Sequence, residues 1–230
     1  MSRKSIRVLL ADDHAAIRQG LRMILSAETD LEVVGEAADG NTAVQMSQQL
    51  EPDVLLMDIR MPGMDGVEAT RRITEFGTAK VLILTTFDLD DYVLAALRAG
   101  ASGFLLKSAS AEELLNGIRK VNSGHSVLAT EVTEVVIRNM RAAASASVHP
   151  KTEPDLGELT ERELEVLKAV GAGWTNQQAA RRLGIAETTV KTHVSRIFSK
   201  LGLVSRVQAA IFCLENGIST KPGRDQSDSI

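Results

Sequence analysis

The stretch that decides the fold is residues 54–63, which read VLLMDIRMPG. Its first four residues form a continuous apolar run, which favours a β-strand buried on both faces. Asp58 follows this run directly, and Pro62 and Gly63 then end the strand and begin a loop. We therefore expect Asp58 to stand at the carboxyl end of a parallel strand, where open α/β sheets bind their ligands. The alternative, in which Asp58 only caps a turn, has to be weighed against the rest of the chain.

Composition limits the class of protein. A chain of 230 residues predicts one large domain or two ordinary ones, and a hydrophobic content of 44% allows a sizeable core. No apolar run reaches the roughly 18 residues that a membrane span needs, and no signal peptide is visible. The single cysteine, Cys213, excludes an internal disulfide and fits a reducing compartment. We expect a soluble, cytoplasmic protein that makes no contact with a membrane.

The first half of the chain alternates apolar runs with amphipathic stretches, which predicts repeated βα units. Strands are expected at 6–11, 32–35, 54–57, 81–84 and 103–106, and helices at 15–26, 41–49, 66–75, 90–99 and 111–123. This pattern predicts an α/β fold with a doubly wound, parallel, five-stranded sheet of the flavodoxin-like order 2-1-3-4-5. The glycine-rich patterns GxGxxG and Walker A are absent from the sequence, which disfavours a nucleotide site.

Polar side chains follow the ends of four of these strands. They are Asp12 and Asp13 after the first, Asp58 after the third, Thr85 and Thr86 at the fourth, and Lys107 after the fifth. In a parallel sheet all of these ends lie on one edge. Three clustered carboxylates repel one another unless a cation neutralises them, and hard oxygen ligands suit Mg²⁺. Lys107 adds a positive charge suited to a phosphoryl oxygen. The alternative is that the acids cap a helix and Lys107 is merely exposed.

Residues 6–123 resemble the receiver domain of two-component response regulators. The matching motifs are LLADDH (9–14), LMDIRMPGMDG (56–66), LTT (84–86) and GFLLK (103–107). The resemblance implies that a sensor histidine kinase phosphorylates Asp58, with Lys107 offsetting charge on the phosphoryl oxygens. It also implies a Mg²⁺ site formed by Asp12, Asp13, Asp58 and the backbone carbonyl of Arg60. Thr85 would be the switch hydroxyl that moves to the phosphate, and Phe104 the aromatic residue that turns into the space it leaves.

The second half of the chain predicts a linker and a small helical module. We place the receiver at 1–124, a linker helix and flexible linker at 125–156, the helical module at 157–218 and a disordered tail at 219–230. The linker helix is expected over 130–144. Residues 157–218 hold eight basic and six acidic side chains, a slight basic excess that suits a polyanionic partner.

The helical module has the spacing of a helix-turn-helix. Thr160 and Glu163 form a capping-box pattern that begins its first helix. Helices are then expected at 176–183, 186–201 and 205–216. Ala180, Gly184 and Val190 supply the small residue at the helix crossing, the left-handed turn and the apolar packing residue that the motif needs. An ordinary helical hairpin is the alternative on spacing alone.

The motifs LTERELEVL (159–167), NQQAA (176–180) and TVKTHV (189–194) are similar to the LuxR-type helix-turn-helix. By that resemblance Lys191, Thr192 and Ser195 face bases in the major groove, while Arg196, Lys200 and Thr175 sit nearer phosphates. Thr188 and Thr189 add hydroxyls to the same exposed face. Ala186 stands at the N-cap position of the third helix, where Ser or Thr is usual.

Together these features predict a response regulator of the NarL/FixJ type, a bacterial transcription factor and not an enzyme. Phosphorylation of Asp58 would shift the receiver surface, promote a homodimer and promote binding to double-stranded promoter DNA. A haloacid-dehalogenase-like phosphatase is a rival, but it expects a second Asp two residues after the first, where this chain has Arg60. The other rival is a regulator that works without phosphorylation and uses its receiver only for dimerisation or ligand binding.

Overall fold

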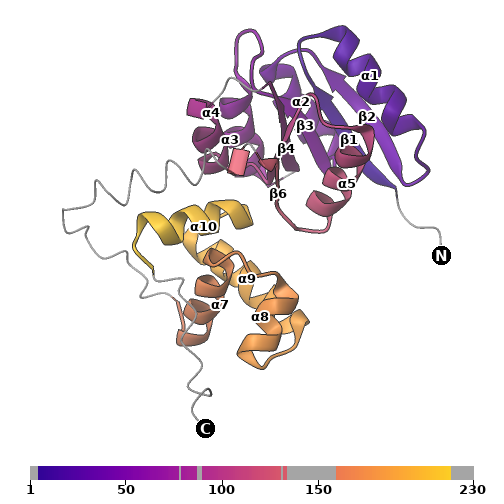
Figure 1. Ribbon diagram of the computed structural model, residues 1–230. Helices are drawn as coiled ribbons and strands as arrows, with labels where there is room; N and C mark the ends of the chain where they lie inside the picture. Colours follow the sequence, from indigo (N-terminus) through magenta and orange to yellow (C-terminus); the bar gives the residue numbers. More distant parts are fainter. Residues whose placement is uncertain (1–4, 78, 87–89, 131, 134–158, 219–230) are drawn as a thin grey trace. The chain divides into compact units, whose positions relative to one another are not determined.

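The computed structural model describes residues 5–77, 79–86, 90–130, 132–133 and 159–218 (Figure 1). The chain divides into two compact units, with the boundary between residues 141 and 142. No helix in the described part of the chain combines the length and the apolar character needed to cross a membrane.

The N-terminal unit is a three-layer α/β domain. Its strands are β1 (Ile6–Ala11), β2 (Leu31–Ala37), β3 (Val54–Asp58), β4 (Lys80–Thr85), β5 (Gly103–Leu106) and β6 (Val127–Leu128). Its helices are α1 (Ala15–Ser26), α2 (Gly40–Leu50), α3 (Gly66–Phe76), α4 (Asp90–Arg98) and α5 (Ala111–Asn122). Helices α1 and α5 cover one face of the sheet, and α2, α3 and α4 cover the other (Figure 1).

The sheet is entirely parallel and has the strand order β2-β1-β3-β4-β5-β6. The predicted order 2-1-3-4-5 is therefore confirmed, with strand ends shifted by a residue or two. β3 is central and buried along its whole length, as its continuous apolar run predicts. Because it lies between β1 and β4, it carries Asp58 to the middle of the carboxyl edge.

The sixth strand was not predicted. Val127 and Leu128 fall in the segment we expected to be linker, yet they pair with Gly103 and Phe104 of β5. Gly103 permits this pairing, since a Cβ there would stand 2.7 Å from the carbonyl oxygen of Val127. The sheet consequently extends past residue 124. Of the helix expected over 130–144, residues 130, 132 and 133 are described and are helical, while 134–158 and the tail 219–230 lie outside the described residues.

The C-terminal unit is a helical module built from α7 (Glu161–Gly171), α8 (Asn176–Leu183), α9 (Glu187–Leu201) and α10 (Arg206–Glu215). The capping box of Thr160 and Glu163 is present, and a second one joins Thr175 to Gln178 at the start of α8. Its core gathers apolar residues from all four helices, including Leu167, Ala180, Val190, Ile197 and Cys213.

Candidate functional site

The carboxyl ends of three strands bring two carboxylates and an ammonium group into contact. Asp58 is the last residue of β3, while Asp12 follows β1 and Lys107 follows β5. The Nζ of Lys107 lies 2.6 Å from Oδ2 of Asp12 and 2.9 Å from Oδ2 of Asp58. Lys107 thus bridges two acids that are far apart in the sequence.

Burial makes this group chemically unusual. Asp12 is 2% exposed and Asp58 is 5% exposed. Burial raises the pKa of Asp58, and the hydrogen bond and charge of Lys107 offset only part of that effect. Burial lowers the pKa of Lys107, but its bonds to Asp12 and Asp58 outweigh this and leave the pKa raised. Lys107 therefore stays charged. Its charge offsets only part of the cost of burying the Asp58 carboxylate at the carboxyl edge of the sheet.

The same edge offers donor atoms for a cation. Carboxylate oxygens of Asp12, Asp13 and Asp58 and a ring nitrogen of His14 all lie within 4.8 Å of one another. Asp13 Oδ1 is buried and accepts no hydrogen bond from the described residues. A set of hard oxygen donors of this kind fits Mg²⁺. Arg60 follows β3 with its side chain exposed, and its backbone carbonyl remains a predicted ligand.

Two glycines hold the loop that follows Asp58. A Cβ at Gly66 would stand 2.0 Å from the carbonyl oxygen of Asp58, and one at Gly40 would stand 2.4 Å from that of Met64. The backbone N–H of Gly66 also donates to the Ile59 carbonyl at 2.8 Å. Helices α2 and α3 can approach the loop only because side chains are absent here. The close backbone approach at these glycines was not predicted, although the Asp-Gly pairs 39–40 and 65–66 are typical of turns.

The two predicted switch residues lie on the neighbouring strands β4 and β5, two register positions apart. Thr85 ends β4 and is buried, and its hydroxyl donates to the Thr86 carbonyl at 3.1 Å rather than to Asp58. Phe104 in β5 is fully buried beside Ile83 of β4. The aromatic ring is therefore buried in this conformation, and its turn on phosphorylation remains a prediction.

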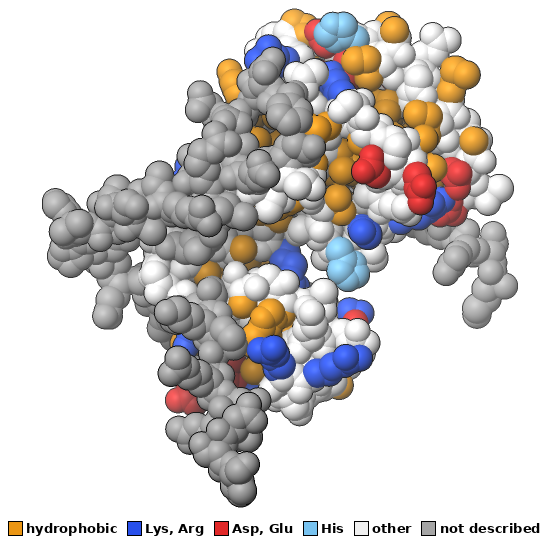
Figure 2. Space-filling model, in the orientation of Figure 1, with side chains coloured by type: hydrophobic (Ala, Val, Ile, Leu, Met, Phe, Trp, Pro, Cys, Tyr) orange, Lys and Arg blue, Asp and Glu red, His pale blue; other side chains and the backbone are white. Residues whose placement is uncertain are grey.

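The second unit presents a helix-turn-helix. Gly184 ends α8 in the left-handed conformation with φ +65, and Ala180 and Val190 are buried at the helix contact. Ala186 makes no side-chain cap at the start of α9. All of the predicted DNA residues are exposed: Thr175, Thr188, Thr189, Lys191, Thr192, Ser195, Arg196 and Lys200. Lys and Arg side chains lie on the face of this unit seen in Figure 2.

Lys200 is placed differently from the rest of that set. Its Nζ lies 2.7 Å from Oε2 of Glu163, a carboxylate on α7 that is 3% exposed. The ammonium of Lys200 and the Thr160 cap lower the pKa of Glu163 to about 2. The side chain of Lys200 therefore ties α9 to α7, and the phosphate contact that we expected of it remains a prediction.

Comparison with known proteins identifies both units. The model of the response regulator receiver domain matches residues 8–119, and that of the luxR family of bacterial regulatory proteins matches residues 157–213. An uncharacterized transcriptional regulatory protein of Bacillus subtilis, YxjL, is 40% identical over 220 residues, which is 95% of this chain and 99% of YxjL.

The chain belongs to the NarL/FixJ family of response regulators. The nitrate/nitrite response regulator NarL of Escherichia coli is 36% identical over 206 residues, covering 89% of this chain and 93% of NarL. Among solved structures, the response regulator ChrA of a heme-sensing two-component system is 39% identical with a TM-score of 0.52. That comparison covers 91% of this chain and 96% of ChrA.

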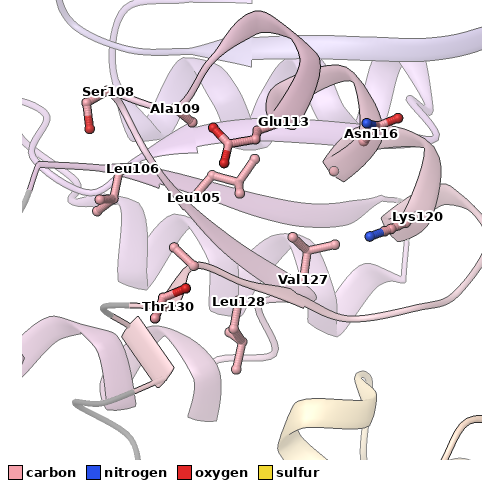
Figure 3. A pocket seen from close by; sticks show the side chains of 12 residues that line it. Leu105, Leu106, Ser108, Ala109, Glu113, Asn116, Lys120, Val127, Leu128 and Thr130 are labelled. Carbon is pink, nitrogen blue, oxygen red and sulfur yellow. The ribbon is translucent and has the colours of Figure 1, made fainter.

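This response regulator also has a pocket that its sequence did not predict. A cavity of about 450 Å³ lies between β5, α5 and β6, with Leu105 and Val127 on the strand side and Glu113 and Lys120 on the helix side (Figure 3). The described residues that line it do not include Asp12, Asp58 or Lys107. The cavity depends on β6, so a sequence analysis that missed the strand could not have found it.

A set of contacts around Trp174 in the helical module was also not predicted from the sequence. Arg206, at the start of α10, donates to Oδ1 of Asn176 at 2.9 Å and to the backbone carbonyl of Trp174. Arg182 stacks over the Trp174 ring at 4.4 Å from its centroid. These contacts fix the segment that leads into α8. Helical periodicity gives the face of each residue but not its partner on another helix.

Proposed function

We propose that Asp58 is the phosphoryl acceptor of this response regulator. The observation that carries the proposal is the buried Asp58 carboxylate with Lys107 2.9 Å from its Oδ2. A carboxylate oxygen of Asp58 forms the new bond to phosphorus, and the P–N bond of the phosphohistidine in a sensor kinase breaks. The imidazole keeps the electron pair and takes up a proton. Lys107 offsets the negative charge on the phosphoryl oxygens as they arrive.

The residues that would hold Mg²⁺ are Asp12, Asp13, Asp58 and the Arg60 carbonyl. Bound there, the ion would neutralise the acids and orient the phosphoryl donor. Lys107 already bridges Asp12 and Asp58 through one oxygen of each, which leaves their other oxygens and Asp13 for a cation. The closeness of the carboxylate oxygens of Asp12, Asp13 and Asp58, all within 4.8 Å of one another, supports this assignment.

Phosphorylation would be transmitted through Thr85. Among the described residues its hydroxyl bonds to the next carbonyl along the chain, at 3.1 Å, so turning toward a phosphorylated Asp58 breaks one weak contact there. Because Thr85 ends β4 and the Lys107 N–H donates to its carbonyl at 2.7 Å, movement there reaches β5 directly. The surface near β4, α4 and β5 is therefore the two-state element of this proposal.

We further propose that the helical module binds double-stranded promoter DNA as a homodimer when Asp58 is phosphorylated. One recognition helix reads one half-site, and paired modules read two. Lys191, Thr192 and Ser195 project from the exposed face of α9 toward base edges, and Arg196 and Thr175 lie toward phosphates. The protein then works in the cytoplasm as a transcription factor rather than as an enzyme.

The acceptor is tested by labelling the full chain with radioactive acetyl phosphate and Mg²⁺. Asp58→Asn should lose the label. Asp65→Asn is the matched control, because Asp65 lies on the same loop and only caps α3 by accepting from the Glu68 N–H. Since Asn is an equally good N-cap, this variant should label like the unaltered chain. Full labelling of Asp58→Asn would remove Asp58 from the role.

A further inference from the structure

His14 stands at the rim of the acidic cluster. It is the N-cap residue of α1, yet its side chain makes no capping hydrogen bond. The imidazole is 66% exposed, and its Nδ1 lies 2.6 Å from Oδ1 of Asp13 and 3.5 Å from Oδ1 of Asp12. The backbone N–H of His14 donates to the same Asp12 oxygen at 2.9 Å, which fixes the position of the residue.

The Nδ1 of His14 and the Oδ1 of Asp13, 2.6 Å apart, form an ion pair when the imidazole is protonated. The neutral imidazole instead offers a nitrogen lone pair, and Asp13 Oδ1 accepts no hydrogen bond from the described residues. Two donor atoms on one octahedral ion, each about 2.1 Å from the metal, lie about 3 Å apart. Ligand atoms of Asp12, Asp13, His14 and Asp58 all lie within 4.8 Å of one another, so the ring nitrogen is close enough to share one ion with the carboxylates.

We propose that His14 is a nitrogen ligand of this site, which allows the receiver to bind a divalent transition-metal ion such as Ni²⁺ or Co²⁺ as well as Mg²⁺. The inference rests on the metal site of the proposed function and adds a ligand to it. Carboxylate and water ligands satisfy Mg²⁺, which gains little from an imidazole. Later first-row ions favour imidazole and bind a mixed nitrogen and oxygen set more tightly. His14 is therefore a residue that widens the choice of metal.

The test is calorimetric titration of the metal-free, full-length chain with NiCl₂ and separately with MgCl₂. His14→Phe keeps a ring of similar size but removes the nitrogen. It should weaken Ni²⁺ at least about tenfold, the usual effect of losing a group that supports a metal, and leave Mg²⁺ affinity unchanged. His14→Ala should behave in the same way, since His14 provides no cap to α1. His125→Phe is the matched control, because His125 is an exposed histidine of the same unit whose Nδ1 contacts Ser123.

The outcomes separate this inference from the site on which it rests. Asp58→Asn should weaken both ions, because it removes a shared ligand. Suppose that Asp58→Asn weakens both ions. If His14→Phe then leaves the Ni²⁺ affinity unchanged, or weakens Ni²⁺ and Mg²⁺ by the same factor, the role of His14 is overturned and the acidic site stands. If Asp58→Asn changes neither affinity, the ions bind elsewhere, and the metal part of the proposed function fails together with the inference.

Discussion

Asp58 lies buried at the end of a strand, yet its proposed chemistry needs a charged carboxylate. The Lys107 ammonium offsets part of the cost of burying this charge, because it forms ion pairs with both Asp58 and Asp12. The cost that Lys107 does not offset is reflected in the pKa of Asp58, which burial raises. A buried carboxylate that is costly to keep ionised is stabilised when it binds a cation or a phosphoryl group. The cost of burying the Asp58 charge therefore favours its proposed chemistry.

The raised pKa makes a prediction about stability and pH. Ionising Asp58 costs more in the fold than in the unfolded chain. Its contribution to stability is therefore complete below the unfolded pKa and is lost as the pH rises through the folded pKa. Without divalent ions at neutral pH, Asp58→Asn should therefore raise the Tm. The gain should shrink as the pH falls toward about 4. Thermal scans across this range measure it, and a lower Tm for the variant at neutral pH would contradict it.

At the scale of elements, the β3–α3 loop is built around Gly66. A methyl group at this position would collide with the backbone of Asp58 at 2.0 Å. Gly66→Ala should therefore move the loop and cost about 2 kcal/mol or more of unfolding free energy. It should also slow labelling by acetyl phosphate.

Gly20→Ala on α1 is the matched control for this substitution. No atom lies within 4 Å of a Cβ there, and alanine favours a helix, so stability should stay equal or rise. Denaturant unfolding of both variants provides the comparison. Equal stability of the Gly66 and Gly20 variants would show that the close approach is not required.

We propose that Lys200 stabilises the recognition helix α9 through its ion pair with Glu163 and does not contact phosphate. Losing one phosphate contact lowers the slope of log affinity against log salt by about 0.9. Arg196→Met should show that change, because Arg196 is exposed on α9. Lys200→Met should instead leave the slope unchanged and lower the Tm, since it strips the partner from the buried carboxylate of Glu163. A reduced salt slope for Lys200→Met would restore it to the DNA interface.

The elements differ in how far sequence could predict them. The position of Asp58 followed from an uninterrupted apolar run and a Pro-Gly stop, since both signals are local. β6 has only two residues and so no period, and its pairing depends on Gly103 in another strand. Lys200 shows the same limit, because helical spacing placed it on the outer side of α9 but could not reveal Glu163 approaching from α7. Contacts between elements are where local patterns lose their information.

For the whole molecule, we propose that a phosphoryl group on one unit controls DNA binding by the other. Such coupling requires that the two forms of the receiver differ in how they favour paired modules. Typical coupling between sites changes affinity by about 5- to 150-fold. The receiver residues that carry the input and the α9 residues that carry the output belong to separate compact units.

The most direct test is the affinity of the full-length protein for a DNA fragment selected from genomic DNA by its phosphorylated form. It is measured with and without acetyl phosphate and Mg²⁺ at fixed salt, for the unaltered chain and for Asp58→Asn. Phosphorylation should tighten binding by the unaltered chain at least about tenfold, within the usual range of such coupling. The Asp58→Asn variant should bind with the weaker affinity in both conditions. Equal affinity of the labelled and unlabelled protein would contradict this account and support a regulator that works without phosphorylation.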